Sequence, residues 1–79
     1  MAEWARSARD SLKQNSQLTK SEVMALDDPK NHFQWHAYDL GFGNFDYSIT
    51  WLANGKKVVA IGSGLVETVK SAKISRYQL

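Results

Sequence analysis

The chain has 79 residues, a formal net charge of +2 and no cysteine, and 43% of its residues are apolar. These values predict one folded domain over residues 1–79 and exclude a disordered tail and a disulfide-stabilised scaffold. No apolar run approaches the roughly 20 residues that span a bilayer, and no secretory signal follows the charged N-terminus, so we expect a cytoplasmic protein.

Two segments of the chain differ in charge. Residues 1–53 carry five basic side chains against seven acidic ones, whereas residues 54–79 carry five basic side chains against Glu67 alone. A basic segment attracts nucleic acid or an acidic protein surface, although a solvated face has the same composition. The candidate nucleic-acid contacts are the five basic residues Lys56, Lys57, Lys70, Lys73 and Arg76.

A helix is predicted over residues 2–14. Trp4, Ala8 and Leu12 recur there at helical spacing, with Arg6 and Arg9 on another face. The pattern is that of an amphipathic helix that packs one side on a core.

A second, shorter helix is predicted from a capping box. Thr19 and Glu22 have the spacing at which each side chain accepts a hydrogen bond from the other residue's backbone. This helix ends at Asp28, because the residue before Pro29 is pushed out of the helical region.

Aromatic residues predict a sheet further along the chain. Seven of the nine lie between residues 33 and 51, interleaved with polar residues at a period of two. We expect strands near residues 33–39, 46–53 and 56–62. Asn54 and Gly55 join the last two strands, since both residues tolerate the positive φ of a type I′ turn.

That turn sets the register of the hairpin. Ala53 pairs with Lys56, and Trp51 then lies opposite Val58. One face of the hairpin collects apolar side chains, which we expect to form the core side against which the helices pack: Tyr47, Ile49, Trp51, Val58 and Ala60.

The C-terminal part begins with a glycine-rich corner, Gly62-Ser63-Gly64. Apolar residues follow at helical spacing and predict a final helix over about residues 64–74, while residues 74–79 fit either a helix or a short strand. The predicted fold is α+β: a three-stranded antiparallel meander packed against an N-terminal helix, a short second helix and a C-terminal helix.

This order of elements resembles that of the double-stranded-RNA-binding domain, over residues 33–73. In that family an α-β-β-β-α succession contains a glycine-rich turn that opens into the last helix, where lysines grip phosphates. The resemblance implies duplex-RNA binding. Aligning the family's glycines on Gly62 and Gly64 places Glu67 and Thr68 where the leading lysines belong, so the lysine cluster is absent from this chain.

The glycine-rich corner also lacks the pattern of a phosphate-binding loop. Such a loop ends in lysine and a hydroxyl residue, whereas Leu65 and Val66 follow Gly64. In addition, Glu67 would lie in the first helical turn and repel an anion there. We expect the glycines to serve the tight turn.

His32, His36 and Asp39 are the candidate catalytic or metal-binding group. On a helix their spacing would make them converge, but on the predicted strand the two histidines lie about 13 Å apart. We therefore expect no catalytic residue, metal or cofactor, and place a nuclease or metalloprotein third among the hypotheses.

Binding through a surface is the remaining interpretation. The loop GFGNF places Phe42 and Phe45 among glycines, where an aromatic ring either plugs the core or stands exposed as an anchor. Basic side chains would guide the approach of an acidic partner. The candidate partner-binding residues are Phe42, Phe45, Arg6, Arg9, Lys56 and Lys57.

The predicted function is that of a small non-enzymatic protein, a monomer or homodimer, that docks on another macromolecule. The partner is a protein or a protein–nucleic-acid complex, which the docked chain regulates or inhibits by steric occlusion. A regulator or inhibitor from a phage or mobile element would suit this size. The alternative is a module that binds duplex RNA or DNA through its basic C-terminal patch.

Overall fold

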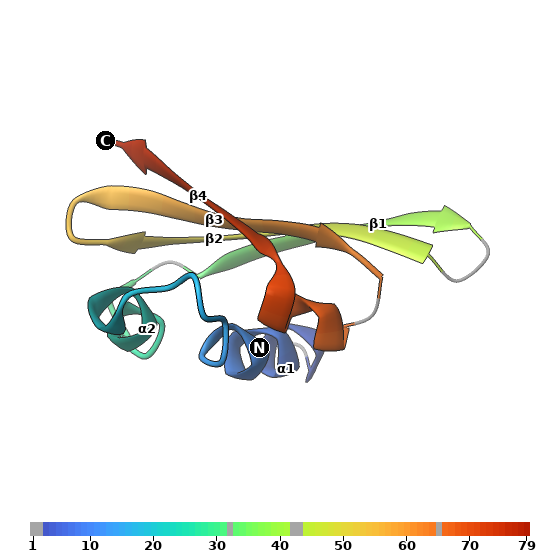
Figure 1. Ribbon diagram of the computed structural model, residues 1–79, viewed down its shortest axis with the longest axis horizontal. Coiled ribbons are helices and arrows are strands. Elements are labelled where there is room, and N and C mark those ends of the chain that lie inside the picture. The colour runs from blue at the N-terminus through green and yellow to red at the C-terminus, as the bar shows by residue number, and fades with distance from the viewer. Residues whose placement is uncertain (1–2, 32, 42–43, 65) are drawn as a thin grey trace.

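The computed structural model describes residues 3–31, 33–41, 44–64 and 66–79. Its elements are α1 (Glu3–Leu12), α2 (Lys20–Ala25), β1 (Gln34–Gly41), β2 (Asn44–Ala53), β3 (Lys56–Ser63), the 3-10 helix η1 (Val66–Ser71) and β4 (Lys73–Gln78). The strands form one antiparallel sheet in the order β1-β2-β3-β4, and the helices lie on one side of it (Figure 1). Within the described ranges, no helix has the length and apolar character needed to cross a membrane.

The sheet has four strands, so the prediction of three was wrong. The predicted final helix over residues 64–74 is replaced by η1, and residues 73–78 pair with β3 as β4. Strand pairing places Ile74 opposite Ala60, where its side chain is buried in the core. The α-β-β-β-α order of the double-stranded-RNA-binding domain is therefore not present.

The central hairpin agrees with its prediction. Asn54 and Gly55 have φ values of 54° and 74°, as the turn requires. The predicted partners face each other, among them Trp51 with Val58. All five residues predicted for the core side are buried: Tyr47, Ile49, Trp51, Val58 and Ala60.

The capping box of α2 is confirmed and also connects this helix to the sheet. The backbone N–H of Glu22 donates to the Thr19 hydroxyl, and the Thr19 N–H donates to the Glu22 carboxylate at 2.8 Å. Trp51 Nε1 donates to the backbone carbonyl of Glu22 at 3.0 Å. The helix start and the largest buried side chain of the sheet therefore stabilise each other.

Buried Asn15 joins the end of α1 to η1. Its side-chain amide donates to the carbonyls of Val69 and Ala72, both at 3.1 Å. Gln17 adds a bond from Nε2 to the same Ala72 carbonyl at 2.9 Å. Because the last carbonyls of a short helix lack partners within it, these bonds satisfy η1 at the point where β4 begins.

The two glycines of the corner have different structural roles. Gly64 has a φ of 100°, which allows the sharp exit from β3. Gly62 lies opposite Tyr47, and a Cβ there would stand 2.7 Å from the Tyr47 Cζ. The missing side chain lets the tyrosine ring lie across β3 and place its hydroxyl 3.0 Å from Thr68 of η1.

Candidate docking surface

The side of the sheet that faces away from the helices is the candidate functional surface. Alternate residues of each strand point to this side, which no described element covers (Figure 1). We call it the open face. Its described members are Gln34, His36 and Tyr38 of β1, Asp46, Ser48, Thr50 and Leu52 of β2, Lys57, Val59, Ile61 and Ser63 of β3, and Lys73, Ser75 and Tyr77 of β4.

Several large side chains of the open face are exposed to solvent. The exposed fractions are 61% for Tyr38, 47% for Ile61 and 53% for Tyr77, and Leu52 is also exposed. Val59, in the middle of the face, is buried by its neighbours. Tyr38 and Tyr77 lie on the two edge strands and Ile61 lies on β3, so these exposed side chains are distributed across the open face.

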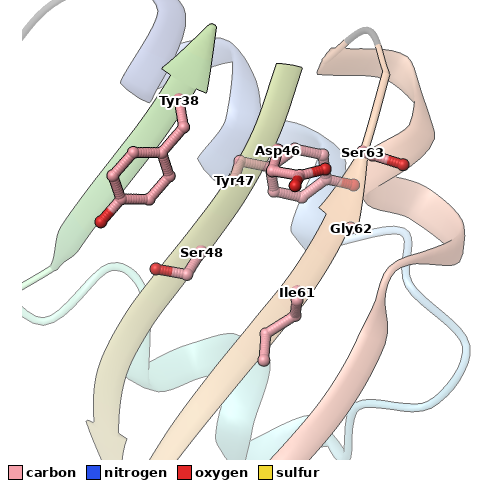
Figure 2. A pocket seen from close by; sticks show the side chains of 7 residues that line it. All are labelled: Tyr38, Asp46, Tyr47, Ser48, Ile61, Gly62 and Ser63. Carbon is pink, nitrogen blue, oxygen red and sulfur yellow. The ribbon is translucent and has the colours of Figure 1, made fainter. Parts of the chain in front are cut away.

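A hollow of about 480 Å³ lies on the open face above β2. Figure 2 shows Tyr38 on β1 and Ile61 on β3, on either side of Ser48. Asp46 contributes the one carboxylate of its lining. A second hollow of about 200 Å³ lies between the same strands near Leu52 and Lys57.

Charge is unevenly distributed over the open face. Lys57 lies in a cross-strand row between Leu52 and Tyr77, and Lys73 lies beside Ile61. The acidic side chain Asp46 lies opposite Tyr38 on the other half of the sheet. The β3–β4 half is therefore basic, and each of its lysines has a large apolar neighbour.

The predicted partner-binding cations do not gather on one surface. Lys57 lies on the open face, whereas exposed Lys56 has the opposite orientation in β3. Arg6 and Arg9 belong to α1, on the helix side of the sheet (Figure 1). The Arg9 guanidinium lies 4.8 Å from the centre of the Phe33 ring, so it helps to pack α1 against the start of the sheet.

The two predicted aromatic anchors lie outside what the structure describes. Phe42 is not among the described residues, and of Phe45 the structure describes the backbone, in β2 opposite Asp39. Their role as anchors stays a prediction.

Arg76, predicted as a nucleic-acid contact, has a structural role. Its Nε lies 2.6 Å from Oε2 of Glu22, and its Nη2 donates to Oε1 of Glu22 and to the Gln17 carbonyl, both at 2.8 Å. These bonds, with help from Thr19 and against the effect of burial, lower the pKa of Glu22 from 4.5 to about 2. The contact joins β4 to α2 on the helix side.

The remaining members of the predicted basic patch are divided between the two sides of the sheet. Lys70 belongs to η1 in the helix layer, while Lys57 and Lys73 lie on the open face. The five basic residues therefore do not form one continuous surface.

The structure describes only part of the predicted histidine group. His32 lies outside the described residues, and His36 is exposed on the open face opposite Ser48. Among the side chains that the structure describes, no three His, Asp or Glu groups gather where they would hold a metal ion.

Sequence reasoning missed the apolar side chains of the open face. Leu52, Ile61 and Tyr77 were not among the candidate residues, although the first two lie at alternate strand positions opposite the predicted core side. The period-two pattern could have identified those two. Tyr77 could be identified only by recognising residues 73–78 as a strand.

In comparisons with known proteins, no family model, no curated protein and no solved structure matches this chain.

Proposed function

We propose that this chain is a small, non-enzymatic cytoplasmic protein that docks on another protein through the open face. Bound there, it regulates or inhibits its partner by steric occlusion, as a phage or mobile-element inhibitor would. The observation that carries this proposal is the set of exposed apolar side chains on one uncovered face of the sheet, above all Tyr38, Ile61 and Tyr77.

The composition of the open face supports a protein partner. Tyrosine is enriched at protein interfaces because it buries a large apolar area with little loss of side-chain freedom. Full burial of one such side chain is worth about 1.5–3 kcal/mol. Three of them at one interface would supply a large part of the free energy of a specific complex.

The proposal is tested with two variants that differ in the side of the sheet they change. Ile61→Ser combined with Tyr77→Ser removes apolar surface from the open face. Met24→Ser removes a side chain that is 65% exposed on α2 and serves as the matched control. Circular dichroism first checks that both variants fold.

Tagged wild-type protein and both variants are then used to capture partners from cells that express the chain. We expect one protein to be retained by wild type and by Met24→Ser, and its affinity for the double variant to fall at least tenfold. Equal retention by all three would contradict docking through the open face.

The predicted anchors of the 41–45 loop need a separate variant. If Phe42→Ala weakens partner binding by more than 1 kcal/mol while the domain stays folded, the 41–45 segment belongs to the docking surface. If Phe42→Ala unfolds the domain, the Phe42 ring belongs to the core. The variant Phe45→Ala is interpreted in the same way.

Nucleic-acid binding is the second candidate function. It is favoured by the neighbouring positions of Lys57 and Tyr77, since a cation beside an exposed ring suits phosphate contact and base stacking. Labelled duplex RNA, duplex DNA and single strands are titrated with the protein at low and near-physiological salt. Tight binding with a steep loss of affinity at the higher salt would favour this function, because phosphate contacts release counterions.

A further inference from the structure

We propose that β4 binds an extended acidic segment of the partner protein as a fifth strand of the sheet. This inference rests on the proposed function and specifies the chemistry of the partner.

β4 has the geometry needed to add a strand. It is the last strand in the sheet order and pairs along one side with β3. The other side of an edge strand presents N–H and C=O groups to a further strand, and main-chain hydrogen bonds to such an edge are a common mode of peptide binding. Residues 76–79 at its C-terminal end are exposed.

The basic charge near this edge favours binding of an acidic segment. β3 and β4 contain four basic residues and no acidic one. Arg76 is held by Glu22 on the helix side, which leaves Lys57 and Lys73 on the open face close to the edge. A partner strand beside β4 would bring its own side chains next to Lys73, Ser75 and Tyr77.

Alternation along the strand then predicts the sequence of the segment. Every second partner residue would face the same side as Lys73 and Tyr77. A carboxylate beside Lys73 and an apolar side chain beside Tyr77 would complement these neighbours. The preferred segment is therefore extended, with acidic and apolar residues on the side of the open face.

The same lysines disfavour a second copy of this chain as the occupant. Antiparallel pairing of β4 with β4 of another copy would bring basic strands side by side without a compensating carboxylate. Edge lysines are a known defence against such self-pairing. A partner of opposite charge avoids the repulsion.

The other edge strand, β1, is less suited to an acidic segment. Its pairing with β2 is irregular between Asp39 and Gly41, which interrupts a regular edge. Asp46 lies opposite Tyr38 on the neighbouring strand. An acidic segment would meet negative charge there.

A displayed library of random decapeptides tests the inference against the folded protein. Three forms are used: wild type, the charge-reversed variant Lys57→Glu with Lys73→Glu, and the control Lys20→Glu with Lys30→Glu. The control makes the same change in net charge at exposed positions in and after α2.

We expect wild type and the control to enrich peptides with Asp or Glu at alternating positions, and the charge-reversed variant to bind those peptides at least tenfold more weakly at low salt. Hydrogen exchange with an enriched peptide bound should slow at the amides of Lys73–Gln78. Enrichment without acidic residues, slowing at β1 in place of β4, or equal binding by all three forms would overturn the inference.

The two proposals can fail separately. If no peptide is enriched but the Ile61→Ser, Tyr77→Ser variant still loses a protein partner, docking through the open face stands and strand addition at β4 is wrong. If no peptide is enriched and that variant retains every partner, both fail. If oligonucleotides bind with a steep salt dependence and no peptide binds, the ligand is nucleic acid and the proposal of an acidic segment is wrong.

Discussion

The two faces of the same sheet differ in what their side chains do. On the covered face, Trp51, Tyr47 and Ile49 are buried against the helices, and polar contacts such as that of Trp51 with Glu22 satisfy the groups buried there. On the open face, Tyr38, Ile61 and Tyr77 remain exposed. Substitutions on the covered face should therefore change stability, and substitutions on the open face should change binding.

The largest effect should come from Trp51→Ala. Among the side chains that the structure describes, this change removes the largest fully buried one, and it leaves the Glu22 carbonyl without the Trp51 donor. The expected loss is about 3–5 kcal/mol, a large share of the stability of a small domain. Urea unfolding followed by far-UV circular dichroism measures it. A loss below about 1 kcal/mol would contradict the assignment of Trp51 to the core.

A pH effect should follow from Glu22 and Arg76. The pKa of Glu22 is about 2 in the folded chain and 4.5 without its partners, so the folded state favours the ionised carboxylate. Its stabilisation, up to about 3 kcal/mol, is present above pH 4.5 and is lost as the pH falls toward 2.

Urea unfolding at a series of pH values tests this effect in wild type and in Glu22→Gln. The wild type should lose stability between pH 4.5 and 2, and the variant should show a flatter profile in that range. Parallel profiles in the two proteins would show that other carboxylates cause the acid sensitivity.

Gly62→Ala should cost about 1–3 kcal/mol through overpacking, because the added Cβ would collide with the Tyr47 ring. Thermal unfolding measures the loss. A matched change at an exposed position, Ser63→Ala, should leave the midpoint nearly unchanged. An unchanged midpoint for Gly62→Ala would mean that Tyr47 does not need this space.

The smallest effect on stability should come from Tyr77→Ala, although its effect on binding should be large. More than half of this side chain is exposed, so its truncation should change the free energy of unfolding by about 0.5 kcal/mol or less. The same unfolding assay measures it. A loss comparable to that of Trp51→Ala would place Tyr77 in the core and remove it from the docking surface.

Local signals in the sequence predicted the covered face well. Asn54 and Gly55 determine the turn and hence the register, and period-two alternation then places Trp51 and Val58 on one side. The capping box at Thr19 is equally local. Interactions within a few residues therefore sufficed for the hairpin and for the start of α2.

The C-terminal part depends on contacts that are distant in sequence. The bond from Asn15 to Ala72 spans 57 residues, and that from Arg76 to Glu22 spans 54. Periodicity over residues 74–79 is too short to separate helix from strand, so β4 was not predicted. Because β4 carries Tyr77 and completes the open face, only part of the candidate site could be predicted from the sequence.

Hydroxyl-radical footprinting, alone and with the captured partner, tests the central claim most directly, because tyrosine and methionine side chains both report on exposure. Tyr38 and Tyr77 report on the open face, and Met24 reports on the helix side. We expect oxidation of both tyrosines to fall in the complex while that of Met24 stays the same. Protection of Met24 with unchanged tyrosines would contradict docking through the open face.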